Sequence, residues 1–251
     1  MDRSINQQNL LLGALFLGGM IPRLYTMGSP LAGDEAVTFN HYVHLNFSEI
    51  LFNYPDSNQH PLFSILSNIC LLFFGDHEVA FRLPSLVAGV LAIPLTFYTC
   101  CSLGFSRFIS FLSSLLLALY VPHIAYSHEG RGYALTVFIA LCLIFCSINI
   151  LGSQKLWLWR ILLIVSATSM VIALPSNAFF VAGAAGFCLV LWTFNQSENK
   201  ENQKAHSQYL IPYILSSLLI VAYLLINLGD LQLSAQANSR GNIHWQHFQE
   251  I

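Results

Sequence analysis

Charged side chains are scarce in this chain, at 9% of its 251 residues, and the scarcity excludes most classes of protein. Ordinary soluble domains carry roughly a quarter charged residues, which keep their surfaces in contact with water. A net charge of −2 also provides no basic surface for the phosphates of a nucleic acid. Because apolar residues make up 55% of the chain, the composition indicates a membrane protein that crosses the bilayer several times.

Cysteine patterns and repeats that would define other folds are also missing. The six cysteines form no Cys-x-x-Cys pair and no Cys/His spacing of a metal site. All of them lie inside apolar runs, which is typical of buried and inert thiols. There is no internal repeat and no low-complexity tract, so a repeat array is excluded as well.

Long apolar runs are what the chain has instead. A membrane-spanning helix needs about 20 mainly apolar residues. Seven runs fit that length: Asn9–Met27, Leu83–Leu103, Phe108–Tyr126, Ala134–Leu151, Leu156–Leu174, Ala178–Phe194 and Tyr209–Leu228. An eighth run, Pro61–Phe74, has only 14 residues and is more typical of an interfacial helix.

The distribution of positive charge favours seven spans over eight. With the N-terminus inside, seven spans place six Lys and Arg residues on the inner side and four on the outer side, and eight spans reverse that ratio. The sequence therefore predicts an all-α, polytopic transmembrane helical bundle of about seven spans over residues 1–228. Residues 229–251 are predicted to begin a further outer loop of a truncated chain.

The first outer loop, residues 28–81, is predicted to contain interfacial helices. Apolar residues recur at helical spacing over Glu35–Phe52, with polar residues on the other side. We expect this segment and Pro61–Phe74 to lie at shallow angles on the outer face. Nine of the twelve acidic residues and eight of the nine histidines fall on that side, so a functional site is expected there.

The acidic pair Asp34-Glu35, directly after the first span, is the strongest local signal for chemistry. A carboxylate at the membrane interface can act as a general base toward a hydroxyl group. The alternative is structural: Asp34 caps the helix that follows, and Glu35 lies in its first turn. Both readings stay open at this point.

Two arginines lie on the same side: Arg82 opens the second span, and Arg131 lies between the third and fourth. An arginine at the lipid boundary often only anchors its helix, but two guanidinium groups can also bind a phosphate through their planar forks. His60 and Glu129 add polar groups there. A divalent metal held by Asp34, Glu35, His60 and His128 is a further alternative that no spacing requires.

The order of these motifs resembles one known family. It consists of a span followed by Asp34-Glu35, His60-Pro61-Leu62, Phe81-Arg82-Leu83-Pro84-Ser85 and Tyr126-Ser127-His128-Glu129-Gly130-Arg131-Gly132-Tyr133. Over about residues 9–228 the chain resembles the membrane-embedded GT-C glycosyltransferases that use lipid-phosphate sugars. Within them it looks like the branch of the dolichyl-phosphate-mannose–protein mannosyltransferases and the bacterial aminoarabinose transferase of lipid A.

The resemblance implies roles for individual residues. Asp34 matches the catalytic base, Glu35 the second acid, and Arg82 the arginine placed near the donor phosphate. His60 opens the counterpart of a His-Pro-Pro-Leu motif that lacks its second proline here. Asn177 stands where the family often has a lysine or histidine. Substrate contacts are thus expected from Glu35, His60, Arg82, Glu129 and Arg131.

The predicted function is transfer of a hexose or pentose from a polyprenyl- or dolichyl-phosphate carrier to an acceptor hydroxyl on the outer face. The acceptor would be a glycan, a lipid or a protein. No cofactor is expected, and a C-terminal half on a separate chain is an expected partner because relatives are longer. The expected location is a bacterial inner membrane or, alternatively, the endoplasmic reticulum.

Two other classes stay open. A non-catalytic homologue or assembly subunit would bind the lipid carrier without transferring the sugar. A transporter would be expected to have ionisable residues at mid-membrane depth, and few are present here.

Overall fold

The computed structural model describes residues 2–25, 27–54, 56, 59–150, 155–194 and 200–239. All regular secondary structure in these ranges is helical, which confirms the all-α prediction. The elements are α1 (Asp2–Leu24), α2 (Asp34–His41), α3 (Phe47–Phe52), α4 (Pro61–Phe74), α5 (Glu78–Ser102), α6 (Arg107–Leu119), α7 (Val121–His128), α8 (Tyr133–Asn149), α9 (Leu156–Ala173), η1 (Pro175–Asn177), α10 (Ala178–Phe194), α11 (Lys200–Ile226) and α12 (Leu228–Ser239).

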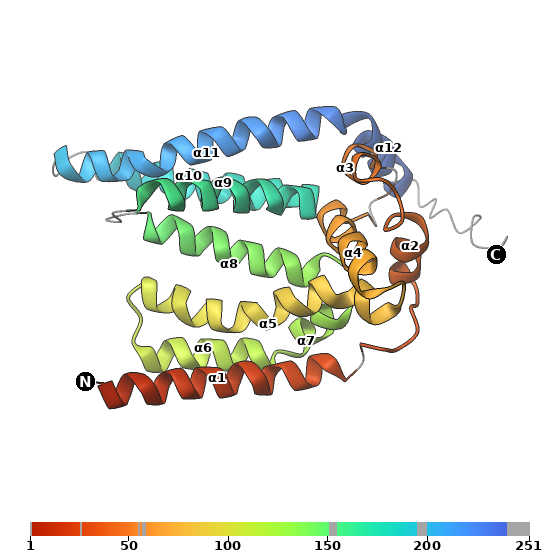
Figure 1. Ribbon diagram of the computed structural model, residues 1–251. Helices are drawn as coiled ribbons and strands as arrows, with labels where there is room; N and C mark the ends of the chain where they lie inside the picture. The colour runs from red at the N-terminus through yellow and green to blue at the C-terminus, as the bar shows by residue number, and fades with distance from the viewer. Residues whose placement is uncertain are drawn as a thin grey trace.

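The long helices run side by side in a bundle, and the short ones gather at one end of it (Figure 1). Helix α5 lies at the centre and packs against α1, α4, α6, α7 and α8, while α9 joins α8 to α11. Helices α2, α3, α4 and α12 cover what we call the α2–α4 end. This end is where the short helices between α1 and α5 meet the helix that follows α11.

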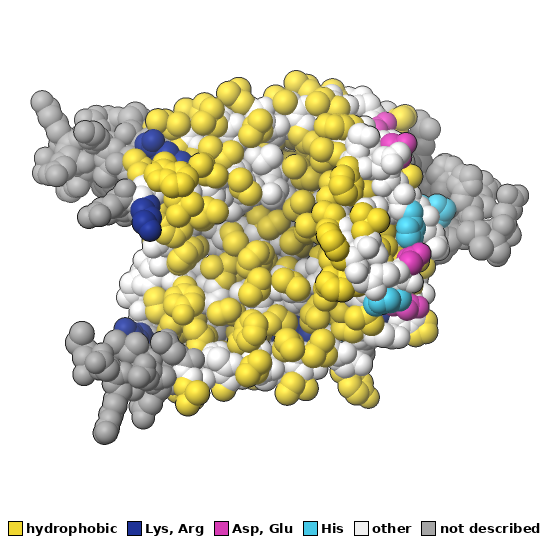
Figure 2. Space-filling view, in the orientation of Figure 1, with side chains coloured by type: hydrophobic (Ala, Val, Ile, Leu, Met, Phe, Trp, Pro, Cys, Tyr) yellow, Lys and Arg dark blue, Asp and Glu magenta, His cyan; other side chains and the backbone are white. Residues whose placement is uncertain are grey.

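The surface matches a protein embedded in a bilayer. Hydrophobic side chains cover the flank of the bundle in view, while acidic and histidine side chains appear at the α2–α4 end and lysine and arginine side chains mainly at the opposite end (Figure 2). Helices α5 and α9 are each long and apolar enough to cross a membrane. The pairs α6–α7 and α11–α12 would each form one more span with a bend, and α1, α8 and α10 are shorter apolar helices. The chain is thus a multi-pass membrane protein, and the count of seven spans stays a prediction.

One predicted span is broken, and another bends at its end. The run Phe108–Tyr126 divides at Tyr120 into α6 and α7, which are bent by 58°. Pro122 explains the break, because a proline cannot donate to the carbonyl four residues earlier. The run Tyr209–Leu228 continues past a 63° bend into α12, so residues 228–239 form a helix where a loop was expected. Residues 240–251 lie outside the described part.

The first outer loop is helical as predicted, but Glu35–Phe52 is not one helix. It divides into α2 and α3 because Asn46 starts a new helix through a reciprocal capping box with Glu49. Helix α4 begins with Pro61 at its first turn and ends before Gly75, whose φ of 97° favours glycine. It lies across the end of the bundle rather than along it (Figure 1).

Opposite accessibility of the two ends tests this arrangement. In a chain whose native cysteines are replaced, His44→Cys lies exposed at the α2–α4 end and Lys155→Cys lies exposed at the other. We expect a membrane-impermeant thiol reagent to label position 44 from the outer side and position 155 only from the inner side. Labelling of both positions from one side would contradict a bundle that spans the bilayer along its long axis.

Candidate active site at the α2–α4 end

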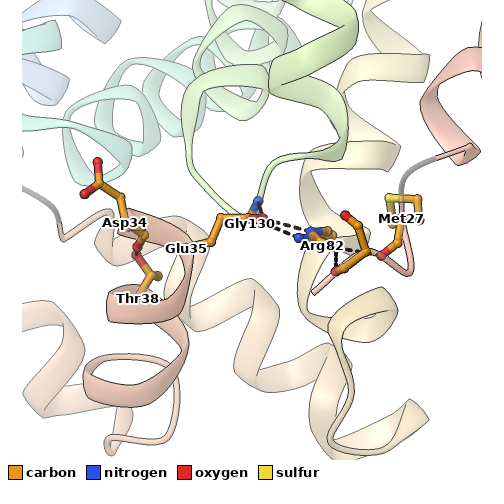
Figure 3. Close-up of polar contacts among 7 residues, drawn as sticks. Met27, Asp34, Glu35, Thr38, Arg82 and Gly130 are labelled. Carbon is orange, nitrogen blue, oxygen red and sulfur yellow. Dashed lines mark hydrogen bonds and ion pairs between the residues drawn. The ribbon is translucent and has the colours of Figure 1, made fainter. Parts of the chain in front are cut away.

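Glu35 and Arg82 form a buried, bidentate ion pair (Figure 3). Nε of Arg82 donates to Oε1 of Glu35 at 2.8 Å, and Nη2 donates to Oε2 at 2.7 Å. Nη1 donates to the carbonyl oxygens of Met27 and Ser29 at 2.9 and 2.6 Å. This fork geometry is the strongest form of an arginine–carboxylate contact, and it fixes α2 and the turn after α1 to the start of α5.

The turn between α7 and α8 supplies a third partner of this pair. The backbone N–H of Gly130 donates to Oε1 of Glu35. A Cβ atom at Gly130 would lie 2.0 Å from Cε1 of Phe81, so only glycine permits this approach. The hydroxyl of Ser85 donates to the carbonyl of Arg131 at 2.7 Å. Helix α5 thus holds the turn that carries the second arginine of the site.

Asp34 points away from Glu35 (Figure 3) and forms a second ion pair, with Nη1 of Arg131. The side chain of Arg131 is only 9% exposed, whereas that of Asp34 is 49% exposed. Asp34 is the first residue of α2, where the helix dipole favours a negative charge. The pair therefore joins a buried cation to a carboxylate that a substrate can reach.

His60 and Tyr133 enclose the guanidinium group of Arg131. Nε2 of His60 lies 3.2 Å from Nη2, and Cζ lies 5.0 Å from the centre of the Tyr133 ring, a cation–π contact. Burial, and then the charge of Arg131, lower the pKa of His60 to about 4. Because arginine only donates hydrogen bonds, Nε2 of the neutral imidazole is the acceptor.

Glu129 lies in the same cluster of charges, directly before Gly130. Its carboxyl group is half-buried, and burial raises its pKa although the charge of Arg131 opposes that shift. Tyr54 is a further buried member that the sequence did not indicate. Burial and then the charge of Asp56 raise its pKa to about 12.

The structure brings together the residues that the sequence singled out, but in two ion pairs rather than around one phosphate. These residues are Asp34, Glu35, His60, Arg82, Glu129 and Arg131. The alternative in which Asp34 caps α2 is wrong, because Gly33 is the N-cap residue and Asp34 is already helical. In the described part of the chain no three His, Cys, Asp or Glu side chains are placed to hold a metal ion, so the alternative metal set is not assembled.

Asn177, which stands where the family often has a lysine or histidine, contacts neighbouring helices of the bundle. Its Nδ2 donates to Oγ1 of Thr136 at 3.3 Å and to the carbonyl of Met170 at 3.0 Å. These contacts join η1 to α8 and α9. They give Asn177 a packing role inside the bundle.

A third arginine, Arg23 near the end of α1, is fully buried. Its Nη1 donates to the carbonyls of Gly19 and Ala118, and its Nε donates to the hydroxyl of Ser127 at 3.1 Å. Nη2 donates to the carbonyl of Leu117 and lies 2.9 Å from Nδ1 of His123. Arg23 therefore ties α1 to both halves of the bent pair α6–α7.

The position of Pro122 explains why Arg23 finds acceptors there. A proline at 122 leaves the carbonyl of Ala118 without its helical donor, and Arg23 supplies one at 3.1 Å. Because Ser127 lies three residues before Gly130, the same contact helps to place the turn at Glu35. A proline inside a predicted span was the sequence signal for this junction.

A membrane-embedded helical bundle with paired carboxylates and guanidinium groups at one end has the architecture of a GT-C glycosyltransferase. The chain belongs to the dolichyl-phosphate-mannose-protein mannosyltransferase family, whose model matches residues 38–233. His60, Arg82, Glu129 and Arg131 lie inside the matched range, and the acidic pair lies just before it. The resemblance inferred from the motifs is thereby confirmed.

Comparison with solved structures supports the same fold. The chain is similar to a chain of the S. cerevisiae protein O-mannosyltransferase Pmt1-Pmt2 complex bound to the sugar donor, with a TM-score of 0.70 and 15% identity. The match covers 91% of this chain and 34% of the yeast chain, so the chain spans about a third of the length of that relative. No match was found among curated proteins.

Replacing the buried guanidinium of Arg23 should destabilise the bundle. Arg23→Leu leaves the carbonyls of Leu117 and Ala118 without their donors, and we expect a loss of at least about 3 kcal/mol in the free energy of unfolding. Arg160→Leu, at the opposite end and only half-buried, is the control and should cost less. Unfolding of both variants in detergent, followed by circular dichroism, decides the matter. Equal free energies of unfolding of the two variants would show that the contacts of Arg23 do not stabilise the bundle.

The lowered pKa of His60 predicts acid sensitivity. Its pKa in the folded protein lies below the ordinary value of 6.5, so the unfolded chain binds the proton first. Stability contributed by this group is therefore present above pH 6.5 and is lost as the pH falls toward 4, by on the order of 3 kcal/mol. His60→Gln keeps an acceptor and removes the titration. Melting temperatures at pH 7.5 and pH 4.5 should differ less in the variant, and an unchanged difference would refute the prediction.

Proposed function

We propose that this chain binds a polyprenyl- or dolichyl-phosphate sugar and transfers the sugar to an acceptor hydroxyl, with Asp34 as the general base. The observation that supports the proposal most is the unequal exposure of the Asp34–Arg131 pair. A carboxylate that is half-exposed can meet an acceptor, while the buried guanidinium beside it can meet a phosphate. Family membership supports the choice of a lipid-phosphate donor.

The reaction that this arrangement suits is a single displacement. The acceptor hydroxyl gives its proton to Asp34 as its oxygen bonds to the anomeric carbon. The bond from that carbon to the phosphate oxygen breaks, and the electron pair leaves with the lipid phosphate. One base is sufficient because the guanidinium of Arg131 compensates the negative charge of the leaving group. Such a displacement inverts the anomeric configuration.

Arg82 and Glu35 support the reaction by position. The guanidinium of Arg82 makes four hydrogen bonds within the protein, two of them to Glu35. We assign the pair to holding α2, so that Asp34 points toward Arg131. The phosphate contact that the resemblance implied for Arg82 then falls mainly to Arg131.

His60 and Glu129 complete the proposed site. A neutral His60 accepts from Arg131 without adding positive charge, and it holds the guanidinium in one orientation. We assign Glu129, half-buried beside the arginines, to accepting hydrogen bonds from sugar hydroxyl groups. The site would face the outer side of the membrane, since most of the lysine and arginine side chains seen on the surface lie at the other end (Figure 2).

A non-catalytic subunit that binds the lipid carrier is the second candidate. It is supported by the pairing of both guanidinium groups with carboxylates of the protein, which accounts for the buried charges without a reaction. Against it stands the half-exposed carboxylate of Asp34, which a site for binding alone does not require. In the transferase Asp34 takes part in sugar transfer, whereas in a non-catalytic subunit it contributes at most to binding.

Asp34→Asn separates these candidates. The amide keeps the size of the side chain and an acceptor for Arg131, but it cannot take a proton. We expect sugar transfer to fall by about 10²–10⁴-fold while binding of a labelled polyprenyl-phosphate sugar stays unchanged. Glu49→Gln, an exposed acid on α3 at the same end, is the matched control and should keep full transfer. Undiminished single-turnover transfer by Asp34→Asn would show that Asp34 is not the general base.

Arg131→Ala should act on binding instead. Loss of the guanidinium removes a charge-assisted contact to the phosphate, and we expect donor binding to weaken by about 2–4 kcal/mol. The measurement is equilibrium binding of the labelled donor in lipid vesicles, with Arg160→Ala as the control. Normal donor affinity in Arg131→Ala would show that the phosphate binds elsewhere.

A further inference from the structure

Two buried amide side chains meet at the end of α3. Nε2 of Gln59 donates to the carbonyl of Ile50 at 3.0 Å, and Nδ2 of Asn227 lies 3.5 Å from the carbonyl of Leu51, the next residue along the helix. Gln59 directly precedes α4, whereas Asn227 lies at the bend between α11 and α12, so the two come from distant parts of the chain. Both side chains are fully buried.

The hydrogen-bond partners determine which way each amide points. Carbonyl oxygens only accept hydrogen bonds, so the amide nitrogens face Ile50 and Leu51 and the amide oxygens face elsewhere. Nδ2 of Asn227 also donates to the carbonyl of Tyr223 at 2.9 Å, which excludes the flipped amide. Oε1 of Gln59 and Oδ1 of Asn227 have no hydrogen-bond donor in the described part of the chain. Two buried acceptors are thus left without a partner.

The hydroxyl group of Tyr223, one turn before Asn227 on α11, is the third polar group at this junction. The side chain is buried, and among the described residues its hydroxyl has no hydrogen-bond partner either. It interacts electrostatically with Tyr54, in the segment between α3 and Gln59. The carboxylate of Asp230 on α12 accepts from the backbone N–H of Tyr54 at 3.0 Å. The three groups therefore lie where the α11–α12 bend meets the end of α3.

Three unpaired polar groups in the interior would be costly. A buried acceptor without a donor loses the hydrogen bonds that water gives it in the unfolded chain, and apolar neighbours do not replace them. The single O–H of Tyr223 cannot supply both amide oxygens, so a donor from outside the chain is required. Buried water typically takes this place and makes about three hydrogen bonds to otherwise unpaired groups.

We propose that Gln59, Tyr223 and Asn227 form a binding site for one ordered water molecule. Its two O–H groups donate to Oε1 of Gln59 and to Oδ1 of Asn227, and its oxygen accepts from the hydroxyl of Tyr223. One molecule thereby satisfies all three groups. A cation fits less well, because the three groups are neutral and a buried charge needs compensation.

The water connects the α11–α12 bend to the candidate active site. Gln59 directly precedes His60, the N-cap residue of α4, whose Nε2 accepts from Arg131. A molecule that joins Gln59 to the bend therefore helps to fix the position from which His60 approaches the guanidinium. The site binds water whether or not the protein transfers a sugar, so it goes beyond the proposed function.

Radiolytic footprinting of the whole chain in lipid vesicles tests the site. An X-ray pulse converts bound water into hydroxyl radicals, which oxidise the side chain in contact with that water even when bulk solvent does not reach it. Tyr213 is the matched control, because it is buried on the same helix but its hydroxyl lies 2.9 Å from that of Ser147. We expect Tyr223 to be oxidised about fivefold more than Tyr213, since only Tyr223 contacts the bound water.

Two variants test which side chains hold the water. Gln59→Met removes one amide oxygen at similar volume and should lower the oxidation of Tyr223 to the level of Tyr213. Gln232→Met, on the exposed side of α12, is the control and should leave it unchanged.

Three results would overturn the proposal. Equal oxidation of Tyr223 and Tyr213 in the wild type would exclude the water, and this comparison does not depend on the folding of any variant. Undiminished oxidation of Tyr223 in folded Gln59→Met would show that Gln59 does not hold the water. Loss of the Tyr223 signal as potassium chloride is raised would indicate a cation site instead.

Discussion

The ion pair between Arg82 and Glu35 is the contact on which the geometry of this end of the protein depends. It is buried, bidentate and joined by the N–H of Gly130, so it connects α2, the start of α5 and the α7–α8 turn at one point. Charges at that depth cannot be left without partners, and each element that brings one is therefore fixed relative to the others. Neighbouring residues on a helix differ by about 100° in direction, which turns Asp34 away from the pair that Glu35 makes.

The two acidic residues thus have unequal freedom. The side chain of Glu35 is 11% exposed, and its oxygens are occupied by Arg82 and Gly130. That of Asp34 is 49% exposed and shares its guanidinium partner with His60. The rigid Glu35–Arg82 pair therefore fixes the direction of Asp34, the proposed general base, while Asp34 stays accessible to an acceptor. The two adjacent acidic residues thus have separate roles.

Much of this was predictable from the sequence, and the limits have physical causes. Length and hydropathy fix the apolar helices, and motif order fixes the family, because both depend on short stretches of chain. The choice of ion-pair partners was not predictable from short stretches. Arg82 contacts Glu35, and Arg131 contacts Asp34, across 47 and 97 residues of the chain. The division of Glu35–Phe52 was missed because Asn46 and Glu49 act locally against a continuous apolar pattern. In the sequence Arg23 counts only as one of the four positive charges assigned to the outer side, since most of its acceptors are backbone carbonyls, which no residue pattern marks.

Pro122 links these features to one another. By breaking the helix it frees the carbonyl that Arg23 binds, and the same break tilts α7 so that Tyr126 reaches Tyr133. A straight helix from α6 through α7 would follow its own axis past Tyr120 and would not carry the turn with Gly130 to Glu35. The break in one span therefore serves two purposes: it positions a backbone donor for the buried pair, and it brings α7 against the Tyr133 ring that lies on Arg131. Both ion pairs of the charged site thus have a contact that depends on the same bend.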